Sequence, residues 1–254
     1  MNILFIGDVI GSPGREKIAD CLPGLKERYG IGLTVVNGEN AAGGIGIVKK
    51  AADEIFSAGA DVITLGNHSF DKKEYAEIIE HPNVVRPANY PELVPGRGFT
   101  VAAGAAIVSL MGRFNMPSVD SPFSAADAVL KKLSSFSPSP KIIVVDFHAE
   151  LTSEKAAMGY YLDGRVSAVI GTHTHVQTAD ERVLPHGTGY ITDAGMVGGL
   201  NSVIGVEKGA VIKKFLTGMP VRFEVEKEDI VINGVVLRVD DETGRCEHIE
   251  RIKK

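Results

Sequence analysis

Short apolar runs alternate with amphipathic stretches along the first part of the chain. Residues 3–7, 33–37 and 61–66 are apolar and bulky, which is typical of buried strands. The stretch after each run predicts a helix. These helices are expected over the segment containing Ile18, Leu22, Leu25 and Tyr29, over residues 48–58 and over residues 71–80. Pro23 is expected to kink or divide the first helix. This alternation indicates a mostly parallel sheet covered on both faces.

The middle of the chain is less regular. Residues 99–111 contain two apolar runs around a glycine and predict a hairpin. Residues 123–135 have helical spacing, and a connection rich in serine and proline follows them. Residues 141–147 and 167–171 predict two more strands with a helix between them. The alternation of strands and helices therefore continues into the second half.

The last part of the chain changes its pattern after a helix expected over residues 206–216. Residues 220–252 alternate apolar and polar positions, and turns are expected at Asn233-Gly234 and Thr243-Gly244. No repeat, low-complexity tract or long linker divides the chain. We therefore expect one domain over residues 1–254, with residues 220–252 as a C-terminal extension of antiparallel strands.

Charge and cysteine content narrow the class of protein. The formal net charge of −5 argues against a basic nucleic-acid footprint, so no stable nucleic-acid complex is expected. The two cysteines, Cys21 and Cys246, lie far apart, which argues against a disulfide framework and fits a reducing compartment. The first residues have neither a signal-peptide pattern nor a membrane span. We expect a cytoplasmic protein, and the sequence is compatible with a homo-oligomer.

Side chains that can bind metal ions recur directly after the predicted strands. In α/β sheets, ligands bind at the carboxyl ends of the strands, so these side chains are expected to meet. They are Asp8, Glu39, Asn40, Asn67, His68, His148, His173 and His175. Each has an ordinary alternative role, because an aspartate after a strand is usually a turn or cap residue and a single histidine is more often structural. Their recurrence at one sheet edge favours a metal site.

The segment from Gly171 to His175 gives the strongest single signal. An H-x-H pair beside a glycine can direct two imidazoles toward one point, and histidine is the commonest metal ligand. The set contains nitrogen and oxygen donors without thiolate, which suits Mn, Fe, Co, Ni or Zn. Two ions about 3.5–4 Å apart can share a hydroxide nucleophile and stabilise both ends of an in-line displacement. Such ions would hold a phosphate on an acidic protein.

These motifs resemble those of the calcineurin-like metallophosphoesterases. The resemblance rests on Gly66-Asn67-His68, on His148 and on the segment from Gly171 to His175. Two departures from that superfamily are informative: Val9-Ile10 follows Asp8 in place of D-x-H, and Gly38-Glu39-Asn40 replaces G-D-x-x-D. With these departures, residues 7–15, 37–42 and 172–180 resemble the YmdB-like branch, and the similarity runs over nearly the whole chain.

The resemblance implies a calcineurin-like fold, which is a four-layer α/β/β/α sandwich with mixed sheets. It implies an iron-type dinuclear centre, with Mn or Zn as other suitable ions, and phosphodiesterase activity on 2′,3′-cyclic nucleotides. One ion would be bound by Asp8, Glu39, Asn40 and His175, and Glu39 would bridge to a second ion bound by Asn67, His148 and His173.

The resemblance leaves His68 as the acid that protonates the leaving alkoxide, because it is adjacent to a ligand without being one. Asp71 could orient His68, although a helix N-cap is the more ordinary role for it. Arg15, Arg86 and Asn89 are candidate phosphate or ribose contacts. The expected substrate is a small phosphodiester or nucleotide, and no membrane partner is expected.

Two other classes of protein compete with this interpretation. Gly7, Gly11 and Gly14 suggest a Rossmann-type nucleotide binder, but Val9 breaks the G-x-G-x-x-G spacing. That class also leaves the strand-end histidines unexplained. The second alternative is a regulatory protein that binds metal or nucleotide without turnover. His68 favours an enzyme, because a binding protein does not need a proton donor.

Overall fold

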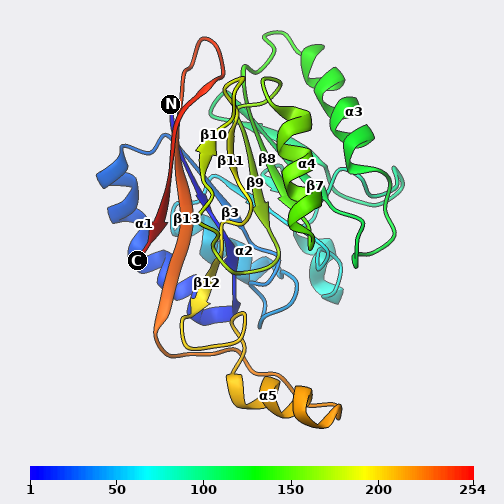
Figure 1. Ribbon diagram of the computed structural model, residues 1–254, viewed down its shortest axis with the longest axis vertical. Coiled ribbons are helices and arrows are strands. Elements are labelled where there is room, and N and C mark those ends of the chain that lie inside the picture. Colours follow the sequence, from blue (N-terminus) through cyan, green and yellow to red (C-terminus); the bar gives the residue numbers. More distant parts are fainter.

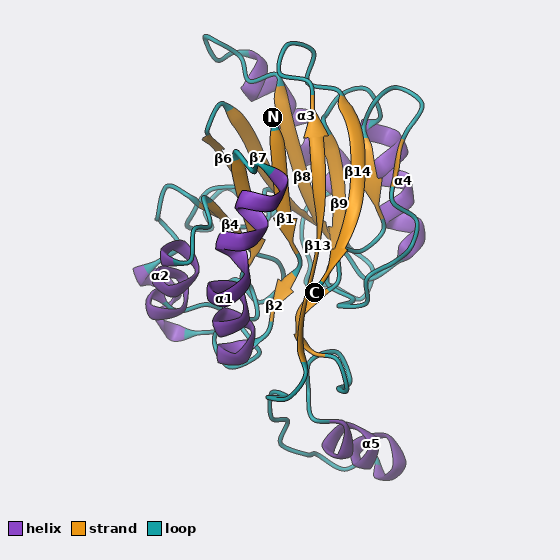
Figure 2. Cartoon of the chain, turned by 90° about the vertical axis from the view of Figure 1, so that its left-hand side faces the viewer, coloured by secondary structure: helices purple, strands orange, loops and turns teal.

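The computed structural model describes residues 1–254 and arranges them in two β-sheets that pack face to face (Figure 1). The helices are α1 (Gly11–Tyr29), α2 (Lys49–Ser57), α3 (Pro122–Ser134), α4 (Thr152–Leu162), α5 (Lys208–Thr217) and the 3-10 helix η1 (Lys73–Glu77). Helices α1 and α2 cover the outer face of one sheet, and α3 and α4 cover that of the other (Figure 2). This is the four-layer α/β/β/α sandwich implied by the resemblance. No helix has the length and apolar character needed to cross a membrane.

The larger sheet has eight strands and contains both parallel and antiparallel pairs. Its strands are β1 (Asn2–Ile6), β2 (Asp8–Val9), β3 (Leu33–Asn37), β4 (Val62–Thr64), β5 (Val84–Val85), β12 (Met196–Gly199), β13 (Ile230–Val239) and β14 (Cys246–Lys253). The strand order is β2-β12-β13-β1-β3-β4-β5, and β14 pairs with β13. Strands β1, β3, β4 and β5 are parallel, whereas β13 runs antiparallel to β1.

The smaller sheet has six strands in the order β10-β11-β9-β8-β7-β6. Its strands are β6 (Phe99–Ala102), β7 (Ala105–Met111), β8 (Ile142–His148), β9 (Ala168–Thr172), β10 (Arg182–Val183) and β11 (Gly189–Ile191). The four central strands are parallel, and both edge strands are antiparallel to their neighbours. The hairpin predicted over residues 99–111 is confirmed as β6 and β7.

Strand β1 shows how the layers are held together. Ile3 and Phe5 belong to the core between the two sheets, whereas Leu4 and Ile6 belong to the core beneath α1 and α2. All four side chains are fully buried. A strand that is buried on both faces has a continuous apolar run in its sequence. Such a run looks the same whether helices or a second sheet cover it. The expectation of one mostly parallel sheet is wrong for this reason, because the strands are divided between two mixed sheets.

The C-terminal region departs from its prediction at two points. The turn expected at Asn233-Gly234 is wrong, because both residues lie inside β13. A Cβ atom on Gly234 would lie 2.3 Å from the carbonyl oxygen of Phe5, so glycine is needed for the close approach of β13 to β1. The antiparallel strands expected from residue 220 begin only at Ile230. The turn expected at Thr243-Gly244 is confirmed between β13 and β14.

Two helix predictions also need correction. The helix predicted over residues 71–80 is reduced to the short η1, and no side chain caps its start. Pro23 does not divide the first helix, because α1 continues through it. The proline ring is exposed, so the carbonyl group that loses its intrahelical partner faces water.

Replacement of Phe5 by alanine tests the core between the sheets. Phe5→Ala should lower the free energy of unfolding by about 3–5 kcal/mol, because it removes a fully buried ring and leaves a cavity. Phe114 is 58% exposed, so the matched Phe114→Ala variant should lose less than about 1 kcal/mol. Urea denaturation of both variants measures the difference. Equal losses would show that Phe5 is not a main contact between the sheets.

Candidate metal centre

The metal-capable side chains predicted from the sequence gather at the carboxyl ends of strands from both sheets. They are Asp8 at the start of β2, Glu39 and Asn40 after β3, Asn67 after β4, His148 at the end of β8, and His173 and His175 after β9. The parallel strands of the two sheets end on the same side of the sandwich, which brings these residues together. Their contacts define two groups that share Glu39.

The first group surrounds Nε2 of His148. This atom lies 2.9 Å from Glu39 Oε1, 2.9 Å from Asn67 Oδ1 and 3.1 Å from His173 Nδ1. Ligand atoms about 2.1 Å from one ion lie about 3 Å from one another in octahedral geometry. A single proton cannot bridge all four atoms, so the arrangement fits a metal ion. Glu39, His148 and His173 also form a compact cluster of candidate ligand atoms.

The second group contains Asp8, Asn40 and His175. His175 Nε2 lies 3.2 Å from Asn40 Nδ2 and 3.7 Å from Asp8 Oδ1. Asp8 Oδ1 is buried without a hydrogen-bond partner, which is costly for a carboxylate oxygen unless a cation faces it. Glu39 Oε1 accepts a hydrogen bond from Asn40 Nδ2 at 3.3 Å and also contacts the first group. Glu39 therefore lies between the two groups.

Burial and mutual charge control the protonation of these residues. Burial raises the pKa of Asp8, although His175 and His148 oppose the rise. Burial would also raise the pKa of Glu39, but the charge and hydrogen bond of His148 outweigh it and lower that pKa. Burial opposes protonation of His148, yet the charge of Glu39 raises its pKa above the usual range. A metal ion at this position would displace the proton from His148, because ligands must be deprotonated.

The H-x-H segment has an unusual backbone. His173 and His175 have φ angles of 93° and 65°, values that residues other than glycine rarely adopt and that are concentrated at functional sites. His173 Nε2 lies 3.1 Å from Glu150 Oε2, which leaves Nδ1 toward His148. His175 Nδ1 lies 2.9 Å from the carbonyl oxygen of Ile204, which leaves Nε2 toward Asp8. The two imidazoles thus enter different groups rather than meeting at one point.

A buried hydrogen-bond network beneath the first group was not predicted from the sequence. Asp146 accepts hydrogen bonds from Thr64 Oγ1 at 2.5 Å, Thr172 Oγ1 at 2.7 Å and Asn37 Nδ2 at 3.0 Å. Thr172 Oγ1 also lies 2.9 Å from His148 Nδ1. Because the Thr172 hydroxyl proton is directed to Asp146, its oxygen accepts from His148 Nδ1. This fixes the imidazole ring with Nε2 toward the centre.

Two further residues support the H-x-H segment. The Asp193 carboxylate accepts hydrogen bonds from the backbone N–H and hydroxyl of Thr174 at 3.1 and 2.7 Å. Asp193 also pairs with the fully buried Lys155 at 2.7 Å. A charged side chain that interrupts an apolar run can reveal such a supporting residue in the sequence, as Asp146 does within residues 142–147.

His68 lies at the edge of the centre. Its backbone N–H donates to Glu39 Oε2 at 3.1 Å, and its Nδ1 lies 2.6 Å from Asp71 Oδ2. The His68 side chain keeps 28% of its surface exposed. Asp71 therefore orients His68 and does not cap a helix, which decides between the two roles expected for it. Gly66 permits this packing, since a Cβ atom there would lie 2.3 Å from His148 Cδ2 and 2.4 Å from Glu39 Oε2.

Two of the candidate substrate contacts, Arg86 and Asn89, make structural hydrogen bonds. Arg86 donates to the carbonyl oxygens of Pro87, Val94 and Pro95, and thus braces the turn around Pro87. Asn89 donates to the carbonyl oxygens of Met111 and Asp120. The hydrogen bonds of these two residues give no evidence for contact with a substrate.

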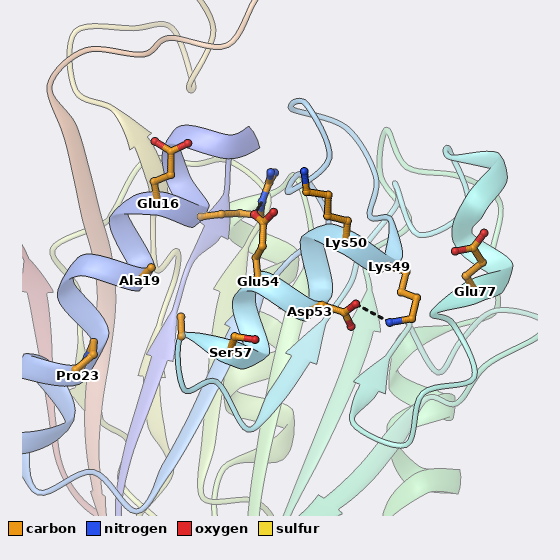
Figure 3. Close-up of a pocket in the computed structure, with 11 residues that line it drawn as sticks. Glu16, Ala19, Pro23, Lys49, Lys50, Asp53, Glu54, Ser57 and Glu77 are labelled. Atoms are coloured by element: carbon orange, nitrogen blue, oxygen red, sulfur yellow. Dashed lines mark hydrogen bonds and ion pairs between the residues drawn. The ribbon is translucent and has the colours of Figure 1, made fainter.

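Arg15 pairs with Glu54 at 2.6 Å and lines a cavity of about 810 Å³ between α1 and α2 (Figure 3). The cavity walls carry acidic and basic side chains, including the ion pair between Lys49 and Asp53. None of the metal-capable residues lies in this cavity. The metal-capable side chains therefore gather at the strand ends and not in this cavity.

Known proteins resemble this chain over its whole length. The family model described as YmdB-like protein matches residues 4–252. A 2′,3′-cyclic-nucleotide 2′-phosphodiesterase of Bacillus subtilis is 49% identical, and the alignment covers 99% of this chain and 96% of that protein. Among solved structures, a phosphatase from Mycoplasma pneumoniae has a TM-score of 0.93 at 36% identity, covering 100% of this chain and 93% of that one.

A second solved structure, of a protein from Thermus thermophilus, has a TM-score of 0.92 at 41% identity. That match covers 100% of this chain and 99% of the other. The expected branch and the expected fold are both confirmed by these matches, and the relatives named for an activity are phosphoester hydrolases, as expected. The chain therefore belongs to the YmdB-like protein family.

Proposed function

We propose that this chain is a metal-dependent phosphodiesterase that hydrolyses small phosphodiesters, with 2′,3′-cyclic nucleotides as its preferred class. The observation that carries this proposal is the convergence of seven nitrogen and oxygen donors in two groups that share Glu39, with the orphaned Asp8 Oδ1 in the second group. The name of the Bacillus subtilis relative supports the substrate class.

We assign Asp8, Asn40 and His175 to one ion, and Asn67, His148 and His173 to a second ion, with Glu39 as the bridge. The donor set suits iron, and it also suits manganese or zinc. When bound, the two ions supply the positive charge that holds a phosphate and activates water. The thiolate-free donor set and the unpaired Asp8 oxygen support this assignment.

His68 is assigned as the proton donor to the leaving ribose oxygen. Asp71 holds Nδ1 of the ring, so Nε2 is the nitrogen available to the substrate. The backbone N–H of His68 is bonded to Glu39, which fixes the residue beside the metal groups. A positioned imidazole of this kind contributes about 10²–10⁴ to the rate of proton transfer steps.

The charge of the protein favours a small substrate. A net charge of −5 leaves no general attraction for a polyanion, which needs a track of lysine and arginine side chains along its backbone. A single phosphate can be held locally at the centre. The cyclic ester also presents its leaving group on the same ribose, within reach of one proton donor.

Metal content tests the bridging role of Glu39. Purified wild-type protein should contain two ions per chain, and Glu39→Ala should lower the occupancy of both positions because its carboxylate faces both groups. His175→Ala is the matched comparison and should remove about one ion, because its contacts lie in one group only. Elemental analysis gives the counts. One ion in active wild-type protein would contradict the arrangement.

Replacement of His68 tests its role as proton donor. His68→Ala should fold and keep its metals but lose about 10²–10⁴ in kcat. The loss should shrink for nitrophenyl esters, whose leaving group hardly needs a proton. His186→Ala is a matched control, since His186 also pairs with an aspartate, Asp163, but is far more exposed. Equal losses on activated and unactivated esters would exclude the role as acid.

A comparison of substrates tests the proposed function itself. The value of kcat/KM should be highest for 2′,3′-cyclic AMP, and lower for 3′,5′-cyclic AMP, a phosphomonoester and a short single-stranded RNA. A tenfold preference for the monoester or the RNA would contradict the substrate class but keep a phosphoesterase. Absence of turnover on all four by metal-loaded protein would instead favour the regulatory binding protein.

A further inference from the structure

The proton donor assigned above fixes the side of the metal centre on which a nucleoside must lie. In a 2′,3′-cyclic nucleotide the leaving oxygen belongs to the ribose, so protonation by His68 requires the sugar to lie against this residue. The phosphate lies at the two groups of metal-capable residues. The base is attached to the far side of the ribose and therefore extends beyond His68. A side chain that recognises the base must lie on that side.

Two aromatic rings lie on the His68 side of the centre. Phe70 follows His68 by two residues, and its ring packs edge-on against Tyr90 with the ring centroids 5.4 Å apart. Asp71, which holds His68 Nδ1, is the next residue after Phe70. Burial raises the pKa of the Tyr90 hydroxyl to about 12, and the charges of Glu39 and Asp71 add to the rise. Tyr90 is therefore near both the partner of the proton donor and the residue between the two metal groups.

A cavity of about 1040 Å³ lies between helix α3 and residues 86–101. It extends along the helix from Ser121, the residue before α3, to Phe136, two residues beyond its end. Tyr90 is one of the lining residues. Pockets for small ligands usually have volumes of about 300–1,000 Å³, so this cavity has ample space for a nucleobase.

The end of the cavity at Tyr90 is fixed to the strand end that carries a predicted metal ligand. Asn89 Nδ2 donates to the carbonyl oxygen of Met111 at 2.7 Å, and Asn89 Oδ1 accepts from the Met111 N–H at 2.9 Å. Met111 is the last residue of β7 and is paired with His148 at the end of β8. Neighbouring strands are about 4.8 Å apart. This end of the cavity therefore lies beside the metal-capable residues and is held in a fixed position relative to them.

Tyr90 offers both a ring and a free hydroxyl to a ligand in this cavity. Its side chain is only partly buried, and its hydroxyl makes no hydrogen bond within the chain. The Tyr161 hydroxyl, by contrast, donates to Asp127 at 2.6 Å. The raised pKa keeps the Tyr90 hydroxyl protonated at neutral pH, so it can donate to a nitrogen or carbonyl oxygen of a base. An aromatic ring can stack on any base, because every base has a π-face.

On the basis of the proposed function, we propose that Tyr90 is the specificity-determining residue that binds the base of the substrate. The base enters the end of the cavity beside Tyr90 and stacks on its ring, while the ribose oxygen meets His68. Phe70 packs at 82° to the Tyr90 ring and holds it in one orientation. The enzyme thereby prefers cyclic nucleotides to phosphodiesters that lack a base.

The test compares 2′,3′-cyclic AMP with the 2′,3′-cyclic phosphate of methyl riboside, which has the same ribose and phosphate but no base. Tyr90→Ala should lower kcat/KM for 2′,3′-cyclic AMP about tenfold to hundredfold, mainly through KM, because stacking on an aromatic side chain contributes on that scale. The value for the base-free ester should stay unchanged. Tyr90→Phe keeps the ring and should lose less activity on 2′,3′-cyclic AMP than Tyr90→Ala.

Tyr161→Ala is the matched control. Tyr161 also packs edge-on against a phenylalanine, with its ring centroid 5.2 Å from that of Phe123, but it lies on α4 and does not line the cavity. Its kinetics should equal those of wild type on both esters. Every variant should keep the wild-type metal content by elemental analysis. If Tyr90→Ala does not fold by circular dichroism, Tyr90→Leu takes its place, because leucine fills much of the space without an aromatic face.

Three results would overturn the role of Tyr90 and leave the phosphodiesterase function in place. They are an equal loss of kcat/KM on both esters, no loss on either ester, and a loss of metal from the Tyr90 variants, which would make Tyr90 a support of the centre. A metal-loaded wild type that hydrolyses neither ester would instead overturn the proposed function, and the assignment of Tyr90 with it.

Discussion

The buried carboxylate of Asp146 joins the two sheets beneath the metal-capable residues. It accepts hydrogen bonds from Asn37 and Thr64 of the larger sheet and from Thr172 of the smaller one. Burial raises the pKa of Asp146, and His148 and these three donors oppose the rise. Thr172 in turn orients His148. The relative position of donors contributed by different sheets therefore depends in part on this buried polar group between the sheets.

The packing of two sheets explains why the metal-capable residues lie at this end of the sandwich. Strands from both sheets end on the same side, and each brings a polar residue immediately after its apolar run. Because every such strand is buried on both faces, the sheets cannot slide past each other without disturbing the cores on either side. Asp8 and His148 lie within strands and the other donors follow strand ends, and among these donors only His173 and His175 have a left-handed backbone. A site of this kind has its geometry set by the fold.

The sequence predicted the convergence of the metal-capable side chains better than the arrangement of the layers. Asp8, Asn67 and His148 were recognisable because apolar runs end at them, and that signal is local. The division of strands between two sheets was not recognisable from the apolar runs, since burial by a helix and by a sheet leaves the same pattern; the resemblance supplied it. Gly234 was misread as a turn because its real constraint, the approach of Phe5, comes from far away in the chain.

The unpaired Asp8 oxygen has a consequence for the lifetime of the protein. With the ions assigned to this centre, binding would stabilise only the folded state, so each tenfold rise in free metal above the dissociation constant would add about 1.4 kcal/mol per bound ion to the free energy of unfolding. Under metal starvation the same chain would unfold more often and become accessible to proteases. The supply of metal would then set the amount of protein in the cell as well as its activity.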